Sequence, residues 1–202
     1  PIGVSKVSKI HKWKKDAFFQ IVFIGHLLEK QGVQMIIEAL PALAKNIPNI
    51  KLVVIGGGPY ETKLKMLSIK INIQNRIEFL GWITDKNKIS QIMEESTIAV
   101  ACYKPEKDKM RNFTYYSDPT KIKEYFSFGL PVIMTNVSFN ARELSERNCA
   151  VVIKYNKHAF IKAVLDFKKS PKLLDTYSRN CLSYIAHFKW DRIFSKSLNE
   201  IF

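Results

Sequence analysis

The chain has 202 residues, of which 47% are hydrophobic and 25% are charged, as is typical of a globular protein. This composition excludes a disordered chain, a collagen-like chain and a disulfide-stapled miniprotein, and no apolar run approaches the ~18–20 residues that span a bilayer. Lysine and arginine outnumber aspartate and glutamate by 32 to 18, and the resulting net charge of +14 favours partners that carry phosphate.

The first half of the chain alternates apolar runs with amphipathic stretches. A near-continuous apolar run over 18–24 ends at Gly25, as expected of a strand that is buried on both faces. After Gly32, apolar residues recur every three or four positions, which predicts a helix that Pro48 ends. The same patterns predict strands over 51–55, 76–80 and 97–101 and helices over 60–72 and 88–95, the second helix capped by Asp85.

The second half begins with a segment, 103–118, that mixes charges and aromatic residues without any period, which predicts a long loop. A helix over 119–128 is predicted next, with Pro119 as its first residue and Ser117 or Asp118 as its cap. Strands over 131–134 and 149–153 enclose a short helix over 139–147. From Asn156 onward only helical patterns remain, with breaks at Pro171 and at Lys189-Trp190.

Six short strands that alternate with helices predict an α/β fold. We expect a Rossmann-like, doubly wound parallel sheet with helices on both faces, the strand order 3-2-1-4-5-6, and a helical C-terminal tail. Ligands of such sheets bind beyond the carboxyl ends of the strands, at the switch point between the first and fourth strands. The loops 25–32 and 103–118 border this point, so we expect the functional site there.

Several common site motifs are missing from the sequence. Residues 25–32 read GHLLEKQG instead of the G-x-G-x-x-G of dinucleotide-binding proteins, and there is no Walker lysine motif. The histidines have no paired spacing and no serine lies in a G-x-S-x-G elbow, so a metal site and serine hydrolase chemistry are disfavoured. The glycines at 56–58 predict a tight strand-to-helix turn, with close approach of a ligand as the alternative.

The three cysteines, Cys102, Cys149 and Cys181, are too few and too scattered for a disulfide framework or a metal knuckle. We therefore expect buried or half-buried free thiols in a reducing, cytoplasmic environment.

The segment from Ser117 to Ile133 carries a more specific signal. The start of its helix offers the unpaired amides of Thr120 and Lys121 and the positive end of the helix dipole, which suit a phosphate. Glu124, about one turn further along, could accept hydrogen bonds from vicinal hydroxyls such as those of a ribose. An ordinary surface helix with a capping acid would show the same residues, so both interpretations stay open.

The string PTKIKEYFSFGLPVI over 119–133 resembles the P-x-K-x-x-E-Y-M-A-x-G-x-P-V-I signature of the group 1 (family 4) glycosyltransferases. These are retaining, nucleotide-sugar-dependent enzymes of the GT-B fold. Further segments resemble the family in the same order, namely 1–4, 24–33, 54–59, 77–82 and 189–191. The resemblance covers only the C-terminal, donor-binding half of that fold. We therefore expect 1–202 to be a single nucleotide-sugar-binding domain without the N-terminal acceptor-binding domain.

The resemblance implies roles for residues around the helix start. Glu124 matches the second glutamate of the family, which binds the donor ribose, and we expect it to be catalytic. The family's first glutamate falls on Tyr116, and either Tyr116 or Asp118 is a candidate substitute for it. The donor-binding candidates in this segment are thus Tyr116, Asp118, Pro119, Thr120 and Lys121, the last two through amides that would receive the pyrophosphate.

The turn after the first strand departs from the family. His26 stands at the position of a phosphate-binding arginine, and Gln31 at that of a lysine, with Lys30 beside it. Lys30 is the expected catalytic cation, and a solvated loop charge is the alternative. Gly25 and His26 would contact the donor, and the backbone of Gly81 and Trp82 would contact the base, although simple packing would also account for Trp82.

The resemblance implies retaining, hexosyltransferase-like transfer from a UDP- or GDP-sugar to a glycan or lipid-linked acceptor, as in polysaccharide biosynthesis. No cofactor and no metal are expected, and the chain would be inactive without its acceptor domain. One alternative is a non-catalytic nucleotide-sugar-binding module. Another is a basic domain that binds nucleic acid or an anionic membrane, of which nucleic acid is disfavoured because no recognition motif is present. The expected location is cytoplasmic, with peripheral attachment to the inner membrane face as an option.

Overall fold

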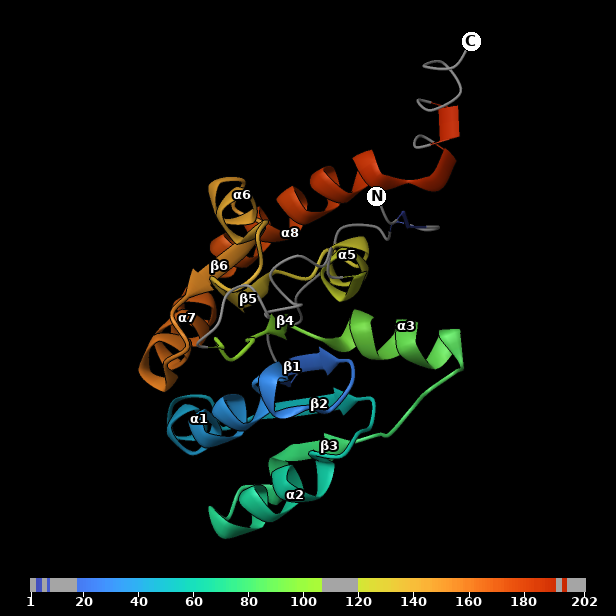
Figure 1. The fold of residues 1–202 in the computed structure, drawn as a ribbon. Coiled ribbons are helices and arrows are strands. Elements are labelled where there is room, and N and C mark those ends of the chain that lie inside the picture. The colour runs from blue at the N-terminus through green and yellow to red at the C-terminus, as the bar shows by residue number, and fades with distance from the viewer. Residues whose placement is uncertain (1–2, 5–6, 8–17, 107–119, 192–193, 196–202) are drawn as a thin grey trace.

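The computed structural model describes residues 3–4, 7, 18–106, 120–191 and 194–195. They form a six-stranded parallel sheet in the order β3-β2-β1-β4-β5-β6, which confirms the predicted doubly wound topology (Figure 1). The strands are β1 (Phe19–Ile24), β2 (Ile50–Ile55), β3 (Ile77–Phe79), β4 (Ile98–Ala101), β5 (Val132–Thr135) and β6 (Ala150–Ile153).

Helices follow almost every strand, at bounds close to those predicted. They are α1 (Val33–Asn46), α2 (Glu61–Lys70), α3 (Lys86–Glu95), α5 (Thr120–Ser127), α6 (Ala141–Glu146), α7 (Lys157–Lys169) and α8 (Pro171–Ile185). The described residues also form three short 3-10 helices: η1 (Glu29–Gln31), η2 (Gln74–Arg76) and η4 (Ala186–Phe188). The predicted cap of α3 is confirmed, since the Asp85 carboxylate accepts a hydrogen bond of 2.8 Å from the amide of Asn87.

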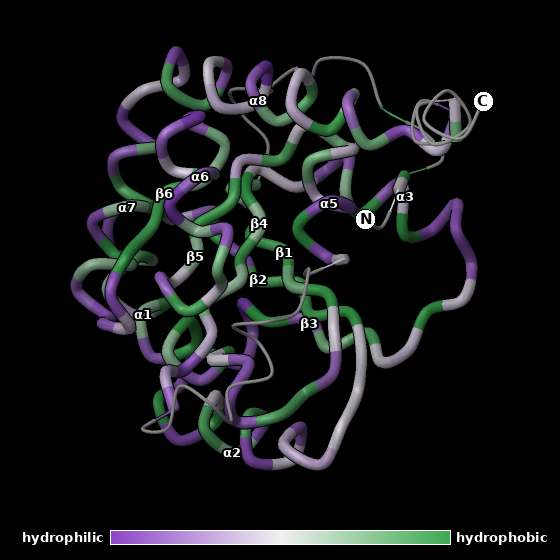
Figure 2. The backbone as a smooth tube through the Cα atoms, turned by 45° about the horizontal axis from the view of Figure 1, so that its top comes forward, coloured by the Kyte–Doolittle hydropathy of each residue, from purple (hydrophilic) through white to green (hydrophobic). Residues whose placement is uncertain are grey.

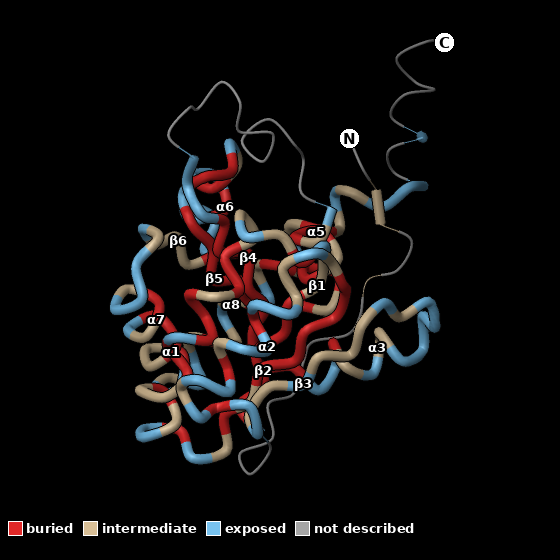
Figure 3. The backbone as a smooth tube through the Cα atoms, turned by 60° about the horizontal axis from the view of Figure 1, so that its bottom comes forward, coloured by how far each residue is buried: buried red, intermediate tan, exposed pale blue. Residues whose placement is uncertain are grey.

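The core lies on both faces of the sheet, because successive side chains of a strand point to opposite faces. In β1, Ile21 and Phe23 pack with α1, α2 and α7, whereas Val22 packs with α3, α5, α6 and α8. Hydrophobic residues concentrate in the central strands (Figure 2), and these strands are buried while the outer turns of the helices are exposed (Figure 3). A strand buried on both faces therefore reads as a continuous apolar run, as predicted for β1.

The segment around Val4 lies beside residues 188–190, which follow α8. The amide of Val4 donates to the Phe188 carbonyl at 2.9 Å, and the amide of Trp190 donates to the Val4 carbonyl at 3.3 Å. A Cβ atom on Gly3 would lie 2.6 Å from the Trp190 ring, so the two segments are packed without a gap. Within the described ranges, no helix is both long and apolar enough to cross a lipid bilayer.

The predicted free thiols are confirmed, because Cys102, Cys149 and Cys181 are all unpaired and buried. Two of them lie close together, and the Cys181 thiol donates to the Cys149 carbonyl at 3.3 Å.

Candidate functional site

Three loops meet beyond the carboxyl ends of β1, β2 and β3. The Gly25 amide donates to the Ile55 carbonyl at 2.9 Å, and the Gly56 amide donates to the Gly81 carbonyl at 2.7 Å. A Cβ atom on Gly56 would lie 2.1 Å from the Gly25 carbonyl oxygen, so no side chain fits there. The glycines thus let the loops pack backbone against backbone, which confirms the tight-turn interpretation.

His26 and Trp82, which the sequence separates by two strands, are in contact at this junction. Their rings meet edge to face, with centroids 5.5 Å apart. Trp82 is nevertheless 65% exposed, so it covers the turn without being part of the core. Gly81 has a φ of +65°, and a Cβ atom there would meet no atom within 4 Å. The backbone of Gly81 and the ring of Trp82 are therefore open to a ligand.

Tyr125, in the second half of α5, holds this helix against the sheet. Its side chain is fully buried, and its hydroxyl accepts a hydrogen bond of 2.8 Å from the amide of Ile24, the last residue of β1. The same hydroxyl donates to the Val100 carbonyl in β4 at 3.4 Å. One side chain thus joins α5 to both strands of the topological switch point.

Replacing Tyr125 by phenylalanine should lower the free energy of unfolding by about 1–3 kcal/mol, because the partly buried Ile24 amide would lose its acceptor. Urea denaturation measures the change. Tyr177→Phe is the matched control, because Tyr177 is only partly buried in α8 and its hydroxyl makes no hydrogen bond to another described residue. Equal losses in the two variants would contradict the positioning role of Tyr125.

The Lys121 side chain reaches from the first turn of α5 to the turn after β1. Its amine lies 2.5 Å from the Gln31 side-chain oxygen, and 4.5 Å and 4.8 Å from the ring centroids of Phe23 and Tyr103. A Cβ atom on Gly25 would lie 3.3 Å from this amine. The amine therefore lies between the start of α5 and the turn after β1, next to Tyr103, the first residue of the second predicted loop.

Burial changes the protonation of two groups on α5. It lowers the pKa of the Lys121 amine to about 7, although the two aromatic rings and the Gln31 oxygen attract its ammonium form. Burial also raises the pKa of the Glu124 carboxyl, which is half-buried and lies three residues after Lys121. Residues three apart lie on one side of a helix, so a cationic and an anionic group share the side of α5 near the switch point.

Lys30 lies next to Gln31 in η1 and is half-buried. Its carbonyl accepts a hydrogen bond of 2.9 Å from the amide of Lys104. A 3-10 helix turns by about 120° per residue, so the side chains of Lys30 and Gln31 leave it in different directions. The Lys104 ammonium group also forms an ion pair with the carboxylate of Glu29, the first residue of η1, at 2.5 Å.

Of the other predicted site residues, some are among the described residues and some are not. Thr120 is exposed at the first position of α5, as a phosphate-binding helix start requires. The candidates Tyr116, Asp118 and Pro119 lie outside the described residues, as does most of the predicted loop 103–118. Among the described residues, no three histidine, cysteine, aspartate or glutamate side chains gather closely enough to hold a metal ion.

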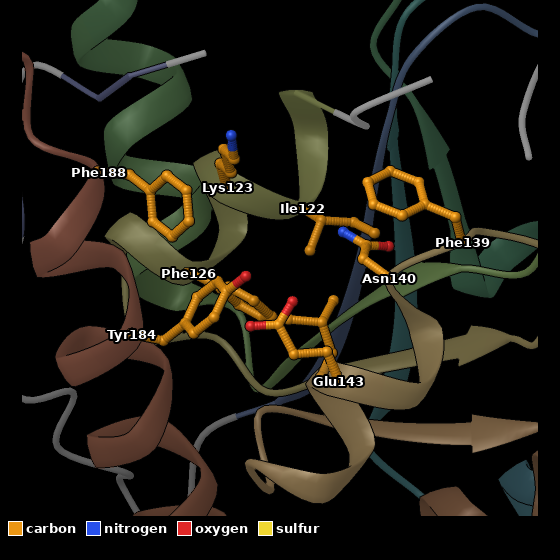
Figure 4. A pocket seen from close by; sticks show the side chains of 9 residues that line it. Ile122, Lys123, Phe126, Phe139, Asn140, Glu143, Tyr184 and Phe188 are labelled. Atoms are coloured by element: carbon orange, nitrogen blue, oxygen red, sulfur yellow. The ribbon is translucent and has the colours of Figure 1, made fainter. Parts of the chain in front are cut away.

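A hollow of about 180 Å³ lies away from these residues, between α5, α6 and the end of α8. Figure 4 shows the side chains that surround it, which are largely apolar, with Phe139 and Phe188 from opposite sides. The Lys123 amine lies 4.4 Å from the centroid of the Phe188 ring. A second hollow, of about 360 Å³, lies near the Glu29–Lys104 ion pair. Neither contains a predicted donor-binding residue.

Comparisons with a family model and with a related sequence both point to glycosyl transferases. Residues 6–182 match the family model described as glycosyl transferases group 1. An uncharacterized glycosyltransferase of Haemophilus influenzae is 24% identical over 176 residues, which are 87% of this chain and 44% of the relative. The chain therefore spans less than half the length of that relative.

Solved structures share the fold. The C-terminal domain of LpcC, a glycosyl transferase group 1 family protein from Francisella tularensis, superposes with a TM-score of 0.69 at 18% identity, over 86% of this chain and 87% of that one. Anabaena Alr3699/HepE, solved in complex with UDP and glucose, superposes with a TM-score of 0.73 at 16% identity, over 93% of this chain and 48% of that one. These likenesses confirm the expected fold, one half of a GT-B architecture.

Proposed function

This chain belongs to the group 1 glycosyl transferases, and we propose that it binds a nucleotide-diphosphate sugar for retaining transfer of the glycosyl group to a glycan or lipid-linked acceptor. The observation that carries the proposal is the meeting of the β1 turn, the Gly81-Trp82 segment and the start of α5 at the switch point of the sheet. HepE, which has the same fold, is known in complex with UDP and glucose.

In this proposal each part of the donor has its own contact. The base lies against the backbone of Gly81 and the exposed ring of Trp82, beside His26. The ribose hydroxyls donate to the Glu124 carboxylate, and the diphosphate lies between Gly25 and the start of α5. Tyr116, Asp118 and Pro119 stay donor-binding predictions of the sequence alone.

The chemistry proposed for this site is stabilisation of the leaving nucleotide diphosphate, on which negative charge develops as the bond to the sugar breaks. Fixed amides at the start of α5 and a nearby cation would supply it, and removing one such donor commonly costs ~3–4 kcal/mol of transition-state stabilisation. Lys30 and Lys121 are the two candidate cations. We propose that a separate domain supplies the acceptor and that this chain is inactive without it, in line with its span of 44% of the H. influenzae relative.

The proposed donor is a UDP-sugar or a GDP-sugar, so the test uses both. Calorimetric titration with UDP-glucose, UDP-N-acetylglucosamine and GDP-mannose should show saturable binding of one nucleotide series. Glu124→Ala should weaken this binding about tenfold to a hundredfold, because it removes hydrogen bonds to a charged group, which typically contribute about 1.5–3 kcal/mol. Glu94→Ala, which removes an exposed carboxylate of α3, is the control and should bind as the wild type does. Binding that ignores the base and disappears with added salt would instead indicate a basic domain that attracts any polyanion.

We also propose that donor binding needs no metal ion, because cationic and amide groups meet the diphosphate. Adding excess EDTA to the same titration should therefore leave the dissociation constant unchanged within about twofold. The control is a repeat with added Mg²⁺ and Mn²⁺, and a gain of tenfold or more with either ion would contradict the metal-free site.

The cytoplasmic side of an anionic membrane is the proposed location, and the net charge of +14 supports it.

A further inference from the structure

The Lys121 amine has surroundings that a purely structural lysine would not need. It leaves α5 toward the sheet and ends on the Gln31 side-chain oxygen at 2.5 Å, between the rings of Phe23 and Tyr103. A neutral amide oxygen is a weak partner for an ammonium group, and among the described residues no carboxylate forms an ion pair with it. The amine is thus held at the edge of the site without its charge being neutralised.

We propose that the Lys121 side-chain amine, and not Lys30, is the cation that binds the donor diphosphate. In the unliganded chain the Gln31 side-chain oxygen holds this amine in place, and the bound diphosphate replaces that oxygen as its partner. The inference rests on the proposed donor-binding function and adds the residue that supplies the charge. It differs from the sequence-based expectation, which used only the backbone amide of Lys121 and assigned the cationic role to Lys30.

The positions of the Lys121 and Lys30 side chains favour Lys121 as the cation that binds the diphosphate. The family lysine falls on Gln31 in this sequence, and the Lys121 amine touches the Gln31 side chain, so the charge lies beside that position although it comes from another element. Lys30 leaves η1 in a different direction from Gln31. The closeness of the Lys121 amine to Gly25 places it where a diphosphate between the β1 turn and α5 would lie.

Burial gives the proposal a measurable signature. The pKa of the Lys121 amine is about 7 in the unliganded chain, so near pH 8 most molecules carry a neutral amine there. A bound diphosphate favours the ammonium form and raises this pKa. Donor binding should therefore take up a proton near pH 8, the amine gaining from solvent the proton that it then shares with a phosphate oxygen.

The first test is calorimetry at pH 8 in buffers of different ionisation enthalpy, with UDP-glucose and GDP-mannose as probes. The phosphates of these sugars do not titrate near this pH, so uptake of up to one proton reports the protein. Lys121→Met should abolish the uptake and weaken binding tenfold or more. Lys70→Met removes an exposed lysine at the end of α2 and should change neither value.

Exchanging the two side chains tests position without changing charge or composition. Lys121→Gln alone should bind weakly, and the double variant Gln31→Lys/Lys121→Gln should recover binding to within about fivefold of the wild type, because the new amine starts from the neighbouring position. Gln31→Glu keeps Lys121 but offers it a carboxylate, and should weaken binding tenfold or more. Circular dichroism checks that every variant is folded.

The outcomes separate this inference from the proposed function. If the nucleotide sugars bind and Lys30→Met loses the binding and proton uptake while Lys121→Met keeps both, the role of Lys121 is overturned and the function stands. Inorganic pyrophosphate serves as a further probe. If it alone binds, and only with Lys121 present, the diphosphate site is supported and the nucleotide-sugar function fails. If no probe binds the wild-type chain, both are overturned.

Discussion

Replacing Gly56 by alanine should destabilise the chain by about 3 kcal/mol or more and disrupt the turn on which the site is built. The backbone at Gly56 has a φ of +121°, which an L-residue rarely adopts, and the added Cβ atom would lie 2.1 Å from the Gly25 carbonyl oxygen. The strained backbone and the overpacking each cost on the order of 1–3 kcal/mol. No side-chain rotation can relieve this clash, because the main chain fixes the positions of both the Cβ atom and the Gly25 carbonyl oxygen. Chemical denaturation measures the loss.

Gly81→Ala separates the two contributions at Gly56. Gly81 also has a positive φ, +65°, but its Cβ atom would meet nothing within 4 Å. At Gly81 an alanine therefore adds only the cost of the left-handed backbone conformation, which is about 1–2 kcal/mol. Equal destabilisation by the two substitutions would show that the contact between Gly56 and Gly25 does not matter to the fold.

Much of the fold could be predicted because its elements leave simple patterns in the sequence. β1 and β2 are buried on both faces, and a short apolar run that ends at a glycine, here Gly25 or Gly56, is typical of such a strand. The strand order was predicted as that of the Rossmann-like, doubly wound architecture, which the alternation of strands and helices favours. The helix bounds deviate by a few residues, as at α6, where Phe139 and Asn140 precede the helix instead of beginning it.

The side chains of the site were less predictable, because their directions depend on packing between elements far apart in the sequence. Spacing places Lys121 at the second residue of a helix, but only the packing of α5 on β1 shows that its amine reaches Gln31. The bond from the Ile24 amide to the Tyr125 hydroxyl joins residues 101 positions apart and has no local signal. The contact of His26 with Trp82 likewise depends on how two loops meet.

A charge that Lys121 holds for a ligand should weaken the unliganded fold, because burying an ammonium group costs free energy. Below pH 7 the amine is charged in both the folded and the unfolded chain, so the folded chain bears the full cost of its burial. Between pH 7 and 10.5 the unfolded chain binds more protons at this group, so the free energy of unfolding rises with pH. Above pH 10.5 the amine is neutral in both states and the cost is gone.

Lys121→Met should therefore stabilise the unliganded chain, most strongly at pH 6. A pKa lowered from 10.5 to about 7 corresponds to about 4–5 kcal/mol, and we expect about half of this at a site that solvent partly reaches. The gain in the free energy of unfolding should shrink by at least half at pH 9.5, measured by urea denaturation at both pH values. Lys70→Met, at an exposed position, should show no gain and no such pH dependence. A gain for Lys121→Met that is the same at pH 6 and pH 9.5 would mean that methionine stabilises by packing alone, and that the amine is not held at a cost to the fold.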